Sequence, residues 1–239
     1  METPPQNTPT ALLVFAKSPI VGTVKTRMQP PLSNRACLIL HDALLRHTLT
    51  KIRTLDKPDI SKVLYLSGNL ADAQQYRLDL GLATDIQVET QVGRDLGERL
   101  VNAMEKKFDE GFRKVVFIGT DTPLLSAKEI RYAIDQLSHC EVVIGPTTDG
   151  GYYLIGFSAS IPAILKGIDW GTPRVYRQTL NLMQLHQVRW KSLLMGSDLD
   201  TFKDLSEVGR IIEDSPSFIS SKEGKDLYQV IRKLLERQS

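Results

Sequence analysis

The chain has 239 residues, of which 30 are lysine or arginine and 28 are aspartate or glutamate, so its formal net charge is +2. This near balance argues against a nucleic-acid-binding protein, in which a large basic excess is usual. Cys37 and Cys140 lie too far apart for a CxxC metal site and are too few for a disulfide framework, so we expect two reduced thiols.

The first nine residues are polar and proline-rich and carry no basic segment of the kind that opens a signal peptide. The apolar run that follows, residues 11–16, is far too short to cross a membrane, and no later run approaches the necessary length. We therefore expect a disordered tail over residues 1–9, one domain over residues 10–239, and a cytoplasmic protein without a membrane anchor. The sequence leaves a homo-oligomer open.

The apolar run at residues 11–16 is continuous, which is typical of a strand buried on both faces of a sheet. Ser33 then precedes a long pattern of apolar residues at helical spacing and is expected to cap that helix. Farther along, Ser126 and Glu129 have the spacing of a capping box, and Pro173 stands at the expected first position of another helix. Further strands are predicted at residues 63–66, 86–91, 114–118, 141–145, 152–157 and 188–195, and further helices at residues 69–80 and 97–112 and on either side of Pro216.

Strands that alternate with helices predict an α/β fold with a largely parallel sheet. The segments at residues 141–145 and 152–157 are joined by a turn rather than a helix, which predicts at least one antiparallel pair in the sheet.

Ligands in such folds bind beyond the carboxyl ends of the strands, so the loops at that edge matter most for function. The loop after the first strand contains Gly22 and the cations Lys17, Lys25 and Arg27, within a segment, residues 3–41, that has no acidic residue. A glycine among hydroxyls and cations suits a backbone cradle for phosphates, and a solvated basic loop is the alternative. The spacing is neither that of a Walker A loop nor that of a GxGxxG dinucleotide-binding motif.

Three aspartates follow predicted strands at positions suited to a divalent cation. Asp121 comes just after the strand at residues 114–118, where its carboxylate could bind Mg²⁺ or Mn²⁺ or could merely organise a turn. Asp198 and Asp200 project to the same side of an extended segment and could share a metal, although Asp200 or Thr201 could instead cap the next helix.

Other segments have two interpretations that the residues alone leave open. Asp149-Gly150-Gly151, between two apolar runs, is also what a plain hairpin turn requires. The segment from Gln91 to Arg99 could contact a base or ribose or could simply cap a helix. The four histidines lack metal-ligand spacing, and neither a Ser-His-Asp order nor an HExxH motif is present, so nothing supports a hydrolase or a zinc enzyme.

Five segments resemble, in this order, motifs of one bacterial family: KSPIVGTVKTR, GTDTPLL, GPTTDGGYYLIG, WGT and DLDTFKDL, within residues 11–205. The family is that of the radical-SAM/selenodomain-associated glycosyltransferases, a branch of the GT-A superfamily of nucleotide-diphospho-sugar transferases. The same superfamily includes nucleotidyltransferases such as guanylyltransferases and CMP-sugar synthetases. The resemblance implies a single-domain, GT-A-like three-layer α/β sandwich with a mixed, mostly parallel central sheet.

The resemblance also implies roles for individual residues. Asp121 matches the carboxylate that holds the metal in GT-A-like enzymes, and Asp198 and Asp200 resemble the DxDT metal motif of CMP-sugar synthetases. Gln91 and Gly93 stand where the superfamily often reads the base. The nucleotide-binding residues that the resemblance implies are Lys17, Gly22, Lys25, Arg27, Gln91, Gly93 and Asp121.

The chain departs from the family pattern around Asp121. Thr120 and Thr122 stand where the family has a Ser/Cys pair, which leaves the charged residues intact. No full DxD tripeptide is present there, because residue 119 is glycine and residue 123 is proline. This departure from a conventional glycosyltransferase metal site leans toward nucleotidyl transfer.

We therefore expect a metal-dependent transferase with a nucleotide substrate, a small-molecule acceptor, and Mg²⁺ or Mn²⁺ as cofactor. Lys25 and Arg27 would neutralise developing negative charge, and Asp149 is the candidate acid–base residue if a sugar is transferred. The family name favours glycosyl transfer from an NDP-sugar. The alternatives are nucleotidyl transfer from an NTP to a phosphorylated small molecule, with release of pyrophosphate, and a non-catalytic nucleotide sensor. We expect neither a nucleic acid nor a membrane as a partner.

Overall fold

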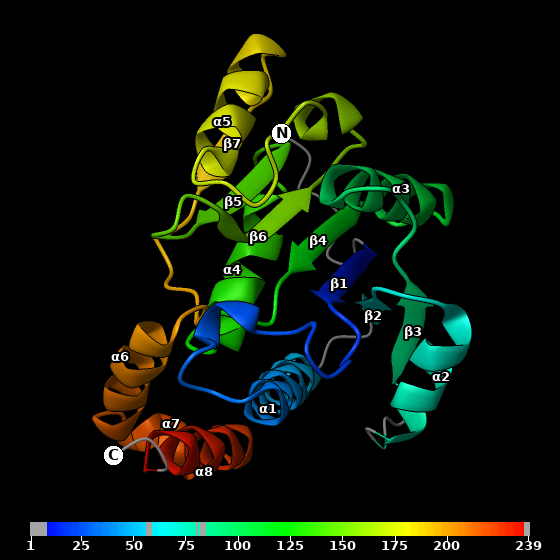
Figure 1. The fold of residues 1–239 in the computed structure, drawn as a ribbon. Helices are drawn as coiled ribbons and strands as arrows, with labels where there is room; N and C mark the ends of the chain where they lie inside the picture. The colour runs from blue at the N-terminus through cyan, green and yellow to red at the C-terminus, as the bar shows by residue number, and fades with distance from the viewer. Residues whose placement is uncertain (1–8, 56–58, 80, 82–84, 237–239) are drawn as a thin grey trace.

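A seven-stranded sheet runs through the chain, with helices packed on both of its faces (Figure 1). The computed structural model describes residues 9–55, 59–79, 81 and 85–236. The strands are β1 (Thr10–Ala16), β2 (Ile60–Leu66), β3 (Ile86–Thr90), β4 (Lys114–Ile118), β5 (Val142–Pro146), β6 (Tyr152–Phe157) and β7 (Trp190–Ser192). The helices are α1 (Asn34–Arg53), α2 (Leu70–Asp79), α3 (Leu96–Asp109), α4 (Ala127–Gln136), α5 (Val175–Leu185), α6 (Phe202–Glu213), α7 (Pro216–Ser220) and α8 (Lys222–Glu236), with short 3-10 segments η1 (Thr26–Met28) and η2 (Pro162–Leu165).

The sheet order is β3-β2-β1-β4-β6-β5-β7. Neighbouring strands are parallel except at β6, which runs antiparallel to both β4 and β5. The turn between β5 and β6 is too short for the crossover that a parallel pair requires, so β6 must reverse direction. The predicted α/β class and the predicted antiparallel pair are therefore both confirmed.

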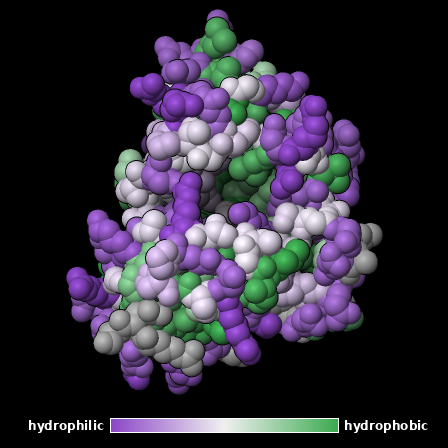
Figure 2. Space-filling model, viewed as in Figure 1, coloured by the Kyte–Doolittle hydropathy of each residue, from purple (hydrophilic) through white to green (hydrophobic). Residues whose placement is uncertain are grey.

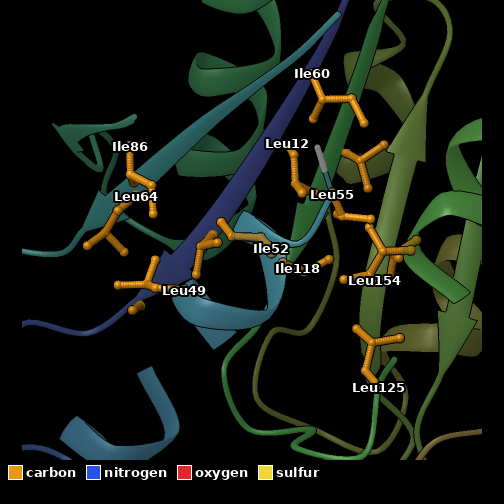
Figure 3. Packing of buried hydrophobic residues seen from close by; sticks show 14 of the residues in the cluster. Leu12, Leu49, Ile52, Leu55, Ile60, Leu64, Ile86, Ile118, Leu125 and Leu154 are labelled. Atoms are coloured by element: carbon orange, nitrogen blue, oxygen red, sulfur yellow. The ribbon is translucent and has the colours of Figure 1, made fainter. Parts of the chain in front are cut away.

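The continuous apolar run of β1 is explained by burial on both sides. Leu12 and Val14 pack into a cluster that lies against α1 and α4, whereas Leu13 faces the opposite cluster, against α3 and α5. Successive side chains of a strand point to opposite faces, so a strand covered by helices on both sides must be apolar at every position. Figure 3 shows the first cluster, where Leu49 and Ile52 of α1 lie near Leu12.

The predicted helix starts are confirmed at two of three positions. Ser33 caps α1 by accepting a hydrogen bond from the backbone N–H of Ala36, and Ser126 forms the complete capping box of α4 with Glu129. The helix expected to begin at Pro173 instead begins at Val175, after a turn in which the Val175 N–H donates to the Thr172 carbonyl.

The C-terminal part also differs from the expectation. Three helices follow residue 200 rather than two, with Pro216 in the first turn of the short helix α7. β7 has only three residues, lies at the sheet edge and pairs with β5 alone, so it is shorter than the strand predicted at residues 188–195. The predicted tail lies outside the described residues apart from Pro9. No helix among the described residues has an apolar stretch long enough to cross a membrane.

A buried ion-pair network joins α3 to the outer strand β3. Lys107 is 1% exposed, and its Nζ lies 2.6 Å from Glu89 Oε1 and 2.8 Å from Glu110 Oε2. Burial raises the pKa of Glu89, but hydrogen bonds from Lys106 and Lys107 outweigh it and lower that pKa to about 2. Removing one buried partner would leave a charge without compensation, so the loss of Lys107 is expected to destabilise the fold.

We expect Lys107→Met to lower the free energy of unfolding by about 2–4 kcal/mol, because Glu89 would keep its charge with one exposed partner. Lys106→Met removes a lysine that is 55% exposed and also contacts Glu89, and should cost less than about 1 kcal/mol. Urea unfolding measures both. Because the pKa of Glu89 is lower in the folded state, the stabilisation is present above its unfolded pKa and is lost as the pH falls toward about 2. The difference in free energy of unfolding between the wild type and Lys107→Met should therefore become smaller as the pH falls. If the two variants were equally destabilised, or if this difference grew at low pH, the role given to the Lys107–Glu89 ion pair would be wrong.

Candidate active site

Two adjoining cavities open at the carboxyl ends of the parallel strands. The larger has a volume of about 540 Å³ and lies beyond β1 and β4, where Figure 2 shows a hollow in this face of the molecule. The smaller has a volume of about 320 Å³. The residues that line both are Arg27, Leu96, Gly171 and Asp200. Two joined cavities at this edge of the sheet suit an enzyme that brings two substrates together.

Lys25 lies at the floor of the larger cavity and is the most constrained residue of the basic loop. Its backbone is left-handed, with φ +50°, which is uncommon for a residue other than glycine. Its side chain is 4% exposed, and Nζ donates to the Leu199 carbonyl at 2.6 Å and contacts Asp121 Oδ1 at 2.7 Å. These contacts hold the ammonium group at one point, which offsets the cost of the unusual backbone.

Asp121 and Asp200 approach the same ammonium group. Asp200 Oδ1 lies 3.8 Å from Lys25 Nζ, and the other oxygen of Asp200 accepts a hydrogen bond from Arg27 at 3.3 Å. Burial raises the pKa of Asp121, but the adjacent Lys25 ammonium outweighs it and holds that pKa below its usual range. The predicted cations of the loop after β1 therefore meet the predicted carboxylates of two other segments in one site.

In the segment before α6, one residue caps the helix and another faces the cavity. Thr201, not Asp200, caps α6, and it forms a full capping box with Asp204. The Asp200 side chain is thereby left to face Lys25 and Arg27. A backbone hydrogen bond of 2.7 Å from the Leu199 N–H to the Asp121 carbonyl ties this segment to the loop after β4.

Asp198 and Asp149 line the smaller cavity. Burial and the charges of Asp121, Asp149 and Asp200 raise the pKa of Asp198 to about 6, although a 2.5 Å hydrogen bond from Thr122 opposes the rise. Asp149 Oδ1 accepts hydrogen bonds from the Thr147 hydroxyl at 2.6 Å and the Gly151 N–H at 3.0 Å. Asp149 therefore organises its turn, as the hairpin interpretation requires, and also faces the cavity.

The other predicted nucleotide-binding residues are placed differently. Lys17 lines the larger cavity, whereas Gly22 lies in an exposed turn with φ +84°, outside the residues that line it. Gln91 lines the cavity too, but its side-chain amide donates to the Ala16 and Tyr65 carbonyls, both at 3.0 Å. A Cβ at Gly93 would lie 2.7 Å from the Arg99 nitrogen, so a glycine is needed for this loop to pass the start of α3. Base recognition by Gln91 and Gly93 stays a prediction.

Three further residues, all on α1, support the site, although no sequence motif pointed to them. His41 Nε2 bonds to the Lys17 carbonyl at 2.9 Å, while His47 Nε2 and Lys51 Nζ both bond to the Pro123 carbonyl, at 3.0 and 2.9 Å. All three side chains project from α1 and are buried. The signal in the sequence is the interruption of an apolar helix face by polar residues. Arg99 lines the larger cavity beside Gln91.

The carboxylates fit a divalent cation that is shared with a phosphate ligand. No group of three or more His, Cys, Asp or Glu side chains within the described part of the chain is arranged to hold a metal alone. Asp121 and Asp200 nevertheless lie on either side of the Lys25 ammonium group, and Mg²⁺ is usually held by one or two carboxylates together with substrate phosphates. Asp198, which lines the smaller cavity with Asp200, adds a third carboxylate near this position.

Comparisons with known proteins show the family of the chain. Residues 48–172 match the family described as "Uncharacterized protein conserved in bacteria (DUF2064)". A relative from Methanothermobacter thermautotrophicus, 2-phospho-L-lactate guanylyltransferase, is 30% identical over 192 residues, which are 77% of this chain and 78% of the relative. The radical-SAM association implied by the resemblance stays a prediction.

Solved structures share the fold. One from Desulfovibrio desulfuricans G20, assigned as a nucleotide-diphospho-sugar transferase, is 30% identical with a TM-score of 0.84, over 94% of this chain and 97% of that one. Rv0371c from Mycobacterium tuberculosis, in complex with manganese, is 18% identical with a TM-score of 0.50, over 85% of this chain and 98% of that one. The chain therefore belongs to the DUF2064 family, has the nucleotide-diphospho-sugar transferase fold, and is a relative of 2-phospho-L-lactate guanylyltransferase.

Proposed function

We propose that this protein is a metal-dependent nucleotidyltransferase that couples an NTP to a phosphorylated small molecule and releases pyrophosphate. The observation that carries the proposal is the buried Lys25 ammonium, held between Asp121 and Asp200 at the floor of the larger cavity. An oxygen of the acceptor phosphate would attack the α-phosphorus, and the bond to the β-phosphate would break with its electron pair leaving on pyrophosphate. Little covalent chemistry is required of the protein, so positioning and charge neutralisation would supply most of the catalysis.

The residues of the basic loop have separate tasks in this proposal. Lys25 is already ordered by its contacts with Asp121 and Leu199, so it would neutralise phosphate charge at little cost in side-chain entropy. Arg27, whose side chain is 62% exposed, borders both cavities and would contact the phosphates where the two substrates meet. Lys17 would bind the nucleotide from the rim of the larger cavity.

Asp121 and Asp200 would hold Mg²⁺ or Mn²⁺, with Asp198 as a further ligand. The bound metal would stabilise the negative charge that develops on the leaving pyrophosphate. The manganese complex of Rv0371c supports a divalent metal on this fold.

Nucleotidyl transfer has more support than the glycosyl transfer that the family name favoured. One relative is named as a guanylyltransferase, and guanylyl transfer is a form of nucleotidyl transfer. The absence of a DxD tripeptide at Asp121 also favours nucleotidyl transfer. Asp149, the acid–base candidate for sugar transfer, uses one carboxylate oxygen to hold its own turn. An attacking phosphate also needs no strong general base, because it is ionised at neutral pH.

We expect pyrophosphate release when the protein is incubated with an NTP, Mg²⁺ or Mn²⁺ and a panel of small phosphate esters. GTP is the first nucleotide to test, because the relative is a guanylyltransferase. Coupled detection of pyrophosphate measures the reaction, and mass spectrometry identifies the nucleotide-linked product. Release of nucleoside diphosphate from an NDP-sugar, with no pyrophosphate from any NTP, would instead establish glycosyl transfer.

We expect Asp121→Asn and Lys25→Met each to lower kcat/KM by at least about a hundredfold, because Lys25 would act on the phosphates directly and Asp121 would act through the metal that it holds. Asp109→Asn, at an exposed position on α3 away from the cavities, is the matched control and should react like the wild type. Thermal unfolding of each variant establishes that it is folded. Turnover by folded Asp121→Asn at the rate of Asp109→Asn would show that the assigned site is wrong.

A further inference from the structure

A third cavity lies beside α1, on a different side of the helix from the larger cavity of the candidate active site. It has a volume of about 490 Å³, within the range of small-molecule sites. Its walls come from α1, α2 and α8, and α8 packs beside α1 (Figure 1). Helix α1 separates the two cavities, since His41 lines the larger cavity and the next residue, Asp42, lines this one. We call it the α1–α8 pocket.

The α1–α8 pocket has an apolar floor and an acidic rim. Leu38, Ile39 and Val230 supply apolar surface, and Ile39 is 42% exposed although it is a large hydrophobic residue. Asp79 of α2 and Asp226 of α8 stand at the two sides. An apolar cavity with a few fixed polar groups is the usual make-up of a site for an organic ligand.

The charges in the pocket favour a cation. Arg46, the basic residue that lines it, is held by Asp42 at 2.7 Å, and Asp42 also accepts a 2.6 Å hydrogen bond from the Tyr76 hydroxyl. With Arg46 matched by Asp42, the charge that is left comes from Asp79 and Asp226 and is negative. A ligand with an apolar body and an ammonium group would satisfy both features.

The pocket is also connected to the catalytic loops. His47 lines it and bonds through Nε2 to the carbonyl of Pro123, two residues after Asp121. Pro19, which belongs to the basic loop, lines it as well. A ligand here would therefore contact Pro19 of the basic loop and His47, which bonds to the loop after β4.

We propose that the α1–α8 pocket binds an organic ammonium ion with an apolar body, and that its occupancy is transmitted through His47 to the loop at Pro123. This is an effector site separate from both substrate cavities. Linkage requires that any ligand which shifts this loop also shifts affinity at the site that the loop builds.

The test is a titration of the ¹⁵N-labelled full chain with 4-phenylbutylamine, followed by amide chemical shifts. We expect saturable shifts at Ile39 and Val230 in the pocket and at Leu124, which follows Pro123. The matched probe 4-phenylbutyrate has the same body and the opposite charge, and should cause no saturable shift. Asp226→Asn should raise the Kd of the amine about threefold to tenfold, while Asp109→Asn should leave it unchanged.

If 4-phenylbutylamine and 4-phenylbutyrate bound equally well, the pocket would bind apolar groups without regard to charge, and the proposal would be overturned. Shifts that saturate in the pocket but leave Leu124 unmoved would overturn the connection through His47. The readout requires no nucleotide and no turnover, so the result does not depend on the proposed nucleotidyl transfer.

Discussion

The site depends on one buried ammonium group. Lys25 Nζ contacts Asp121, Asp200 and the carbonyl of Leu199, and so it joins the loop after β1, the loop after β4 and the segment before α6. These segments lie far apart in the chain, since Lys25 and Leu199 are 174 positions apart. Without the lysine, the carboxylates of Asp121 and Asp200 would repel each other. A buried lysine is stable only when its charge is matched and its donors are used, and here the same contacts that match the charge assemble the cavity.

α1 provides the support beneath this arrangement. Its apolar residues pack on the sheet, while His41 bonds to the carbonyl of Lys17 and His47 and Lys51 bond to the carbonyl of Pro123. One rigid helix therefore fixes the backbone of both loops that carry the charged groups. In the proposed reaction, positioning of the charged groups supplies most of the catalysis, and buried hydrogen bonds from a helix hold the loops that carry those groups. Because His47 also lines the α1–α8 pocket, the pocket is connected to one of these loops.

Much of the fold could be predicted because its signals are local. The apolar run at residues 11–16, the cap at Ser33 and the capping box at Ser126 each act within a few residues, and all three appear in the structure. The start of α5 could not be read in the same way, because a turn closed by Thr172 competes with the preference of Pro173 for a first helical position. The strand predicted at residues 188–195 was too long, because only Trp190–Ser192 pair with β5, and composition alone does not show where pairing ends.

The sequence by itself determined which chemistry the protein carries: cations in one loop, aspartates after two strands, and an α/β order that places them at one edge. It left three choices open, and the tertiary structure decided them through contacts between distant residues. Thr201 rather than Asp200 caps α6, Asp149 both holds its turn and faces the smaller cavity, and the amide of Gln91 is used to join β1 and β2. Residue type and spacing state what a side chain is able to do, but only the folded chain fixes which of several partners lies within hydrogen-bonding distance.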